Sequence, residues 1–455
     1  QCDGERPRCG ACVKRREPGI DCEYPVRQGA VSRYSDLKQT FGKLERENRE
    51  FRELFAYLRE RPEHEAFEVY RRLRTTTDPL GTLQFVRDAD ALLAMPAANS
   101  CSLSDRRAAE IEAEALASSP IKVPSRPWTS VAGDGLVSNL VSSFFKWDHP
   151  FMIPFIDQEL FVRDMRGGEG PHCSAFLVNA ICTLRSIMSD TARQYKQITA
   201  SDLTASFLSE AQMHREREAG KVSITTVQAL YLLFLVSCCD GTNRAGSLFR
   251  FASLNMLQRL NPERVVARLN DDIPHEAEKK RALSRLLWGM FLVESIVSSA
   301  YLKPPPLSPP SFAFIPDRSG MHVHNLDVLG APFTTNSVLP PLVPGSEQAA
   351  YQAGVLLYNV MMYNVHPRGT VGSEWDMRER RALFSRLGAL ENSMVPRLGY
   401  RENPVPQTLH LKTLMNMVAY NIIRPLHPST VIQTGYTART ILLELCAIDV
   451  EIIET

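Results

Sequence analysis

Hydrophobic residues recur with the period of an α-helix over most of the 455-residue chain. Leu136, Leu140 and Phe144, for example, follow one another at intervals of four residues. Similar stripes, each long enough for several helical turns, occupy residues 173–189, 200–219, 224–239, 246–260, 279–302, 346–365, 375–395, 407–422 and 433–453. No segment shows a sustained alternation with period two, so the pattern predicts a mainly α fold with a large all-helical domain over residues 128–455. The ten prolines of residues 303–345 predict a long loop within this domain.

A stricter repeat covers residues 35–61. Bulky residues stand alternately four and three positions apart, as at positions a and d of a heptad: Leu37, Phe41, Leu44, Asn48, Phe51, Phe55 and Leu58. A single asparagine at an a position, such as Asn48, favours a parallel two-stranded coil in a fixed register. We therefore predict a short coiled-coil dimerisation helix that ends before Pro62. The alternative is an amphipathic helix that packs on its own protein.

The segments around this helix differ in composition. Residues 62–94 predict a pair of helices, because Asp78 and Pro79 form a helix start in which a capping residue precedes proline. Residues 25–34 predict a short linker, and the Ala-, Ser- and Pro-rich residues 95–127 predict a flexible one. The helical pattern runs almost to Thr455, so we expect the protein to continue beyond it.

The first 24 residues contain a dense group of cysteines: Cys2, Cys9, Cys12 and Cys22. Thiolates are soft ligands that suit the tetrahedral coordination of zinc, and the two-residue gap between Cys9 and Cys12 lets both sulfurs face one ion. Four thiolates could close a single zinc site. The alternative is a pair of disulfides in a secreted module, which the absence of a signal peptide and of a glycosylation sequon disfavours.

The charge balance does not mark the whole chain as a nucleic-acid binder, because the formal net charge is only +1. Residues 1–34 carry seven Lys or Arg against five Asp or Glu. Within them Lys14, Arg15 and Arg16 form a basic run that could contact DNA phosphates. A solvated run of surface charge is the alternative interpretation of these three residues.

The cysteine segment resembles the last two thirds of a fungal Zn₂Cys₆ binuclear zinc cluster. The matching residues are Cys2, Asp3, Gly4, Pro7, Cys9, Cys12, Cys22 and Tyr24. The resemblance implies that Cys9 bridges two zinc ions, that Cys2 binds the first and that Cys12 and Cys22 bind the second. The family's first two cysteines and its base-reading basic residues would precede Gln1, so two of six zinc ligands are missing and we expect the chain to begin within the motif.

The helical body resembles the fungal-specific transcription factor domain, or middle homology region, over most of residues 128–320. The resemblance rests on the loop with Trp147, His149 and Phe151, on Phe161 to Met165, and on residues 173–181 and 281–305. Residues 62–94 are also similar to a segment common after the coil in regulators of filamentous fungi. For His149 itself the expectation is a core histidine with its hydrogen bonds satisfied.

Together the two resemblances imply a zinc-dependent, sequence-specific regulator of RNA polymerase II transcription. Such a protein binds double-stranded DNA as a homodimer in the nucleus, and its helical domain receives a co-regulator or a small-molecule effector. A second hypothesis is a dimerising regulatory or interaction protein that does not read DNA because half of the cluster is absent. A third is a helical enzyme or ligand-binding body with an incidental zinc knuckle.

The sequence offers no constellation for catalysis. It contains neither a G-x-S-x-G elbow nor a P-loop, and the Gly133-Asp-Gly135 stretch lacks both the third glycine and the preceding strand of a dinucleotide site. His322 and His324 lack a clear third metal ligand. Residues 222–239 carry no charge, but their polar first half favours a buried core helix over a membrane span. We therefore expect neither an enzyme nor a membrane protein.

Overall fold

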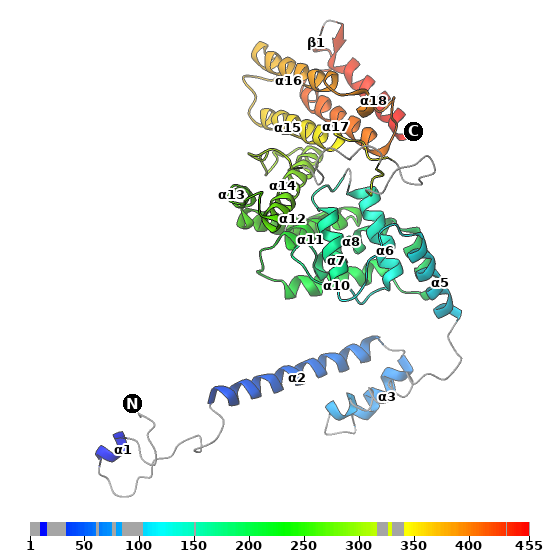
Figure 1. Ribbon diagram of the computed structural model, residues 1–455, viewed down its shortest axis with the longest axis vertical. Coiled ribbons are helices and arrows are strands. Elements are labelled where there is room, and N and C mark those ends of the chain that lie inside the picture. The colour runs from blue at the N-terminus through cyan, green and yellow to red at the C-terminus, as the bar shows by residue number, and fades with distance from the viewer. Residues whose placement is uncertain are drawn as a thin grey trace. The chain divides into compact units, whose positions relative to one another are not determined.

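The computed structural model describes residues 10–15, 33–60, 63–74, 79–83, 103–149, 152–315, 326–329, 341–433 and 435–454. The chain divides into two compact units, Gln1–Ser100 and Cys101–Thr455. Helices make up nearly all of the regular structure in both (Figure 1). The prediction of a mainly α fold is therefore confirmed.

The described residues of the first unit form one long helix and three short helical segments. These are α1 (Gly10–Arg15), α2 (Arg33–Glu60), α3 (Glu63–Leu73) and a helical turn over residues 79–83. Leu54, Val69 and Leu83 are buried together, and Leu58 and Leu73 pack against them with Tyr57. This small core joins the end of α2 to α3 and the helical turn.

The second unit is built from α5 to α18 (Figure 1). Its first part comprises α5 (Leu103–Ser118), α6 (Asp134–Ser143), the π-helical η1 (Phe144–Asp148), α7 (Gln158–Gly167), α8 (Ala175–Met188), α9 (Asp190–Thr199), α10 (Leu203–Arg217), α11 (Ile224–Cys239), α12 (Asn243–Leu260), α13 (Pro262–Val266) and α14 (Pro274–Tyr301). Its second part comprises α15 (Ser346–Val365), α16 (Glu374–Asn392), η2 (Pro396–Leu398), α17 (Pro406–Ile423), a small antiparallel hairpin of β1 (Val431–Gln433) and β2 (Tyr436–Thr437), and α18 (Ala438–Glu454).

Many of these helices begin where the sequence supplies a capping side chain. The oxygens of Asp157, Ser174, Asp202 and Ser223 each accept a hydrogen bond from a backbone N–H three residues later. Such bonds satisfy donors that the first helical turn leaves without partners. The boundaries of α7, α8, α10 and α11 therefore follow from local sequence.

The flexible linker expected at residues 95–127 is wrong over 103–127. Residues 103–118 form α5, and its Glu112 carboxylate accepts hydrogen bonds from the backbone of Gly133 (2.7 Å) and Leu136 (2.8 Å) at the start of α6. The segment that follows is also packed, since Ile121 and Val123 are buried. An Ala-, Arg- and Glu-rich composition has high helix propensity, and a single carboxylate at the N-terminus of α6 helps to hold this helix in place.

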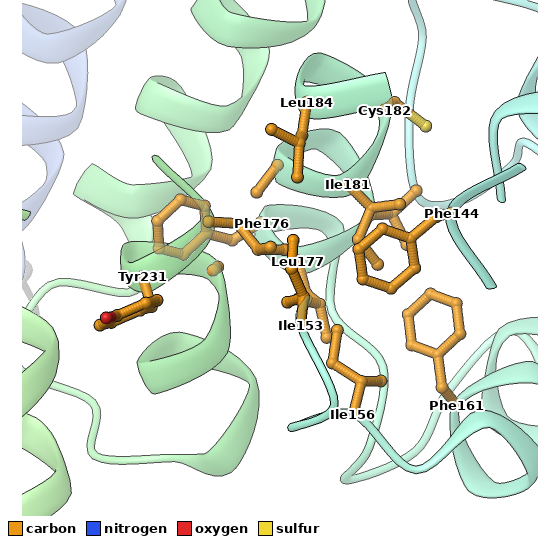
Figure 2. Packing of buried hydrophobic residues seen from close by; sticks show 14 of the residues in the cluster. Phe144, Ile153, Ile156, Phe161, Phe176, Leu177, Ile181, Cys182, Leu184 and Tyr231 are labelled. Carbon is orange, nitrogen blue, oxygen red and sulfur yellow. The ribbon is translucent and has the colours of Figure 1, made fainter. Parts of the chain in front are cut away.

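Helix α14 is shared by two hydrophobic cores. Leu286 and Met290 belong to the first core, part of which Figure 2 shows, whereas Leu292 belongs to the second core, with α15 to α18. Among the described residues, α14 is the one helix long and apolar enough to cross a membrane, and 83% of its most apolar window is buried within the protein. Contact with a core on two sides explains why this helix is apolar on most of its circumference.

A substitution in α14 tests this close packing. A Cβ atom at Gly289 would lie 2.6 Å from both the Pro154 carbonyl oxygen and the Phe155 Cα. Because these are backbone atoms, we expect Gly289→Ala to lower the free energy of unfolding by about 1–3 kcal/mol. Gly388→Ala in α16 is the matched control, since no atom lies within 4 Å of its Cβ position. The control should leave stability unchanged or raise it by up to about 1 kcal/mol. Urea unfolding of both variants measures this, and equal effects would contradict the packing described for α14.

Candidate functional site

The predicted zinc ligands fall largely outside the described residues. Cys12 lies in α1, but its side chain, like Cys2, Cys9 and Cys22, is outside the description. In the part of the chain that the structure describes, no three His, Cys, Asp or Glu side chains lie close enough to hold a metal ion. The zinc site therefore stays a prediction.

The basic run expected to contact phosphates is described only in part. Lys14 lies on α1 with an exposed side chain, and Arg15 ends this helix. Arg16 lies outside the described residues, and so do His322 and His324. The exposed Lys14 could reach a phosphate, and the contact itself stays a prediction.

The predicted dimerisation seam forms one face of α2. The side chains of Phe41, Leu44, Phe51 and Phe55 are 62%, 57%, 39% and 71% exposed. Asn48 is exposed on the same face, and Leu37 lies in α2 with its side chain outside the description. Four large apolar side chains in solvent on one helical face form a surface that a second helix would cover.

The neighbouring face of α2 packs inside its own unit. Leu54 is buried, and Tyr57 and Leu58 lie against Val69. Leu58, predicted as the last seam residue, therefore lies at the border of the two faces, half-buried against α3 and the helical turn. Packing on its own unit, the alternative interpretation of this helix, therefore applies to this neighbouring face. It leaves exposed the face with Phe41, Leu44, Phe51 and Phe55, called the Phe-rich face below.

The aromatic loop after α6 begins with a π-helical stretch. The N–H of His149 donates to the carbonyl of Phe144, 3.0 Å away and five residues earlier. The His149 ring is buried beside Phe144 and Phe145, and its Nε2 contacts the Ile156 carbonyl oxygen. Trp147 is instead 46% exposed with Lys146 over its ring, and Phe151 lies outside the described residues. The expectation of a satisfied core histidine is confirmed.

The electrostatics of this loop predict a pH dependence of stability. Burial, helped by the positive charge of Arg285, lowers the pKa of His149 from 6.5 to about 3. The unfolded chain therefore binds a proton that the folded chain excludes. As the pH falls below the pKa of His149 in the unfolded chain, this residue lowers the free energy of unfolding. Burial also raises the pKa of Asp148 to about 6 despite its ion pair with Arg185. Asp148 therefore raises the free energy of unfolding as the pH falls from about 6 to 4.

Replacing His149 separates these two contributions. Between pH 7 and 5 we expect wild type to lose about 2 kcal/mol of unfolding free energy relative to His149→Gln. Urea unfolding at each pH measures the difference. His427→Gln replaces an exposed histidine, so its unfolding free energy should change with pH in the same way as that of wild type. Parallel curves for wild type and His149→Gln would contradict the lowered pKa.

Buried ion pairs join α14 to its neighbours. Glu294 is fully buried and accepts hydrogen bonds from Tyr231 of α11 (Oη to Oε1, 2.7 Å) and Arg250 of α12 (Nη2 to Oε2, 2.6 Å). Arg285, 2% exposed, pairs with Glu347 of α15 and donates to the Pro154 carbonyl. These charges fix α14 against elements of both cores, since each has a specific partner across a helix interface.

A cavity of about 300 Å³ lies between α16, α17, α18 and the hairpin. Apolar side chains such as Phe384, Met415 and Leu445 line it together with the polar side chains of Glu391, Lys412, Asn416, Gln433 and Glu444. Lys412 and Glu391 form an ion pair (2.5 Å), and both residues also line a second cavity of about 220 Å³. The lining residues come from separate segments between residues 384 and 448, so no local sequence pattern predicts the cavity. A concave site that combines apolar and polar side chains can bind a small molecule.

A known protein family matches part of the helical body. Residues 141–313 match the family described as Fungal specific transcription factor domain. The chain is 32% identical over 202 residues to the notoamide biosynthesis transcriptional activator of Aspergillus versicolor, in an alignment that covers 42% of this chain and 30% of that protein. It is 24% identical over 318 residues to the nitrogen assimilation transcription factor of Emericella nidulans, covering 66% of this chain and 34% of the relative.

A transcriptional regulatory protein of Schizosaccharomyces pombe is 26% identical over 227 residues, which cover 46% of this chain and 59% of the relative. The chain thus spans between about a third and three fifths of the length of these relatives, all named as regulators of transcription. No solved structure matches the chain. The resemblance of the helical body is confirmed, since residues 141–313 match the fungal-specific transcription factor domain and these relatives are named as regulators of transcription.

Proposed function

We propose that the chain is the zinc-cluster, dimerisation and regulatory part of a sequence-specific DNA-binding transcription regulator of the nucleus. The observation that carries the proposal is the order of three features along one chain: clustered cysteines, a heptad helix and a matched regulatory domain. Each feature supplies a different requirement of such a regulator. The relatives named as activators and regulators of transcription support the same conclusion.

Zinc would be held by the thiolates of Cys2, Cys9, Cys12 and Cys22. A donor set of thiolates fits zinc, and two ions per complete cluster would order a segment too short to form a hydrophobic core. Lys14, Arg15 and Arg16 would then contact phosphates, which position a protein on DNA without reading its sequence.

The Phe-rich face of α2 would join two copies of the chain. A homodimer places two zinc clusters side by side and so sets the spacing of the two half-sites on DNA. The exposure of Phe41, Leu44, Phe51 and Phe55 supports this role. Transfer of each large apolar side chain from water into an interface lowers the free energy. The regulatory domain would receive a co-regulator or a small-molecule effector, for which the cavity at α16 to α18 is the best candidate site.

A gel-shift series tests the DNA-binding part of the proposal. The protein purified from its own source is titrated against duplexes that carry CGG half-sites as inverted or direct repeats at varied spacing. We expect one arrangement to bind at least about tenfold more tightly than the others, and a zinc chelator to abolish this binding. Equal binding to every duplex would exclude sequence-specific recognition and favour a dimerising regulator that does not read DNA.

A further inference from the structure

The outer face of α12 presents large apolar side chains to solvent. Leu248 is 71% exposed and Phe251 is 62% exposed, and they lie one helical turn apart. The opposite face of α12 packs on α11, where Gly246 closely approaches Ser237 and the Ser253 hydroxyl donates to the Val227 carbonyl (2.8 Å). The exposed pair is therefore separate from the core that holds α12 in place.

This apolar face has arginines at both ends. Helix α12 has three arginines and no acidic residue in its 18 residues. Arg250 is paired with the buried Glu294, whereas Arg244 and Arg259 are exposed. Helical periodicity places both on the side of Leu248, four residues before it and eleven after it. Among the described residues no carboxylate forms an ion pair with Arg244 or Arg259.

A further cation lies beside this face. The Arg215 guanidinium of α10 lies 5.4 Å from the centre of the Phe249 ring, on the flank next to Leu248. The nearest carboxylates along the chain are Asp240, before α12, and Glu263, which already accepts a hydrogen bond from the Ser311 backbone. The face is thus an apolar centre with a cationic rim.

We propose that the outer face of α12 binds an acidic amphipathic helix of a partner protein. Apolar residues of that helix would cover Leu248 and Phe251, and its carboxylates would pair with Arg244 and Arg259. An apolar centre with a polar rim is the usual composition of a protein interface, and charge complementarity selects an acidic partner. A nucleic acid would satisfy the rim but leave the two apolar side chains without a partner. This inference does not depend on zinc or DNA, so it can fail while the proposed function stands.

Fluorescence anisotropy of two designed peptides tests the proposal with the full chain. One peptide is a helix with leucines at positions i, i+3, i+4 and i+7 and glutamates elsewhere, and the other replaces every glutamate by lysine. We expect the acidic peptide to bind at least about tenfold more tightly, with an affinity that falls as salt rises. Leu248→Ser/Phe251→Ser should weaken its binding at least about tenfold, and Arg244→Glu/Arg259→Glu should reverse the preference between the peptides.

Two matched controls lie on other surfaces. Met188→Ser removes a side chain that is 63% exposed, and Arg386→Glu reverses an exposed charge on α16. Neither should change the affinity for the acidic peptide, and circular dichroism checks that each variant is folded. Equal affinities for the two peptides, or an equal loss with the controls, would overturn the proposal. A change in the sedimentation of the peptide-free chain on Leu248→Ser/Phe251→Ser would also overturn it, because a second copy would then cover this face.

Discussion

Glu294→Ala is expected to lower the unfolding free energy of the second unit by about 3–5 kcal/mol. The substitution leaves the charge of Arg250 in a largely buried position without its partner, and it removes the acceptor of the Tyr231 hydroxyl. An unpaired buried charge costs more free energy than the pair itself contributes, because the charge keeps its desolvation penalty. The site also matters because α14 is shared by both cores of the unit.

A double variant separates the cost of the unpaired charge from that of the lost side chain. Arg250→Met/Glu294→Leu removes both charges and keeps most of the volume, so we expect it to be at least about 2 kcal/mol more stable than Glu294→Ala. Glu379→Ala is the exposed control, because its pair with Arg368 is largely in water and should contribute little. Urea unfolding followed by circular dichroism measures all three. A double variant no more stable than Glu294→Ala would show that buried charge is not the cause.

Phe51→Glu/Phe55→Glu is expected to weaken dimerisation of the chain at least about a hundredfold. In the proposed dimer both side chains leave water, and two glutamates per helix would place four like charges in the seam. Sedimentation velocity over a concentration series measures the dissociation constant. The stability of α2 within its own unit should change little, since neither side chain belongs to the small core around Leu54.

Two further variants of α2 sharpen this test. Arg49→Glu introduces the same side chain on the far face and should leave the dimer intact. Gly42→Ala should tighten it, because alanine favours the helix by about 1 kcal/mol per chain and no atom lies within 4 Å of the Cβ position. A dimer that survives Phe51→Glu/Phe55→Glu would place the contact elsewhere on the chain.

The sequence predicted most helices because their apolar stripes are long and capping residues or prolines mark many of their ends. The interval 346–365 is α15 residue for residue, and the charge-free stretch at 224–239 is α11. Helices α5 and α9 were missed, because α5 lies in an Ala- and Ser-rich segment and only one residue of α9, Ala192, is buried. The hairpin β1–β2 has only two or three residues in each strand, too few for an alternation to be recognised.

The candidate sites were predictable only where they depend on local spacing. The heptad residues of α2 define one helical face by their intervals alone, and the exposure of Phe41 and Phe55 agrees with that face. In contrast, Glu294 looked like an interruption of an apolar run. Its partners Tyr231 and Arg250 lie 63 and 44 residues away, so only tertiary packing reveals the pair.

Native mass spectrometry of the protein from its own source tests the central claim most directly, because it reports chain mass, zinc content and oligomeric state together. We expect a dimer in which each protomer binds zinc that a chelator releases. A monomer without zinc would contradict it, since neither the cysteine cluster nor the Phe-rich face of α2 would then have its proposed role.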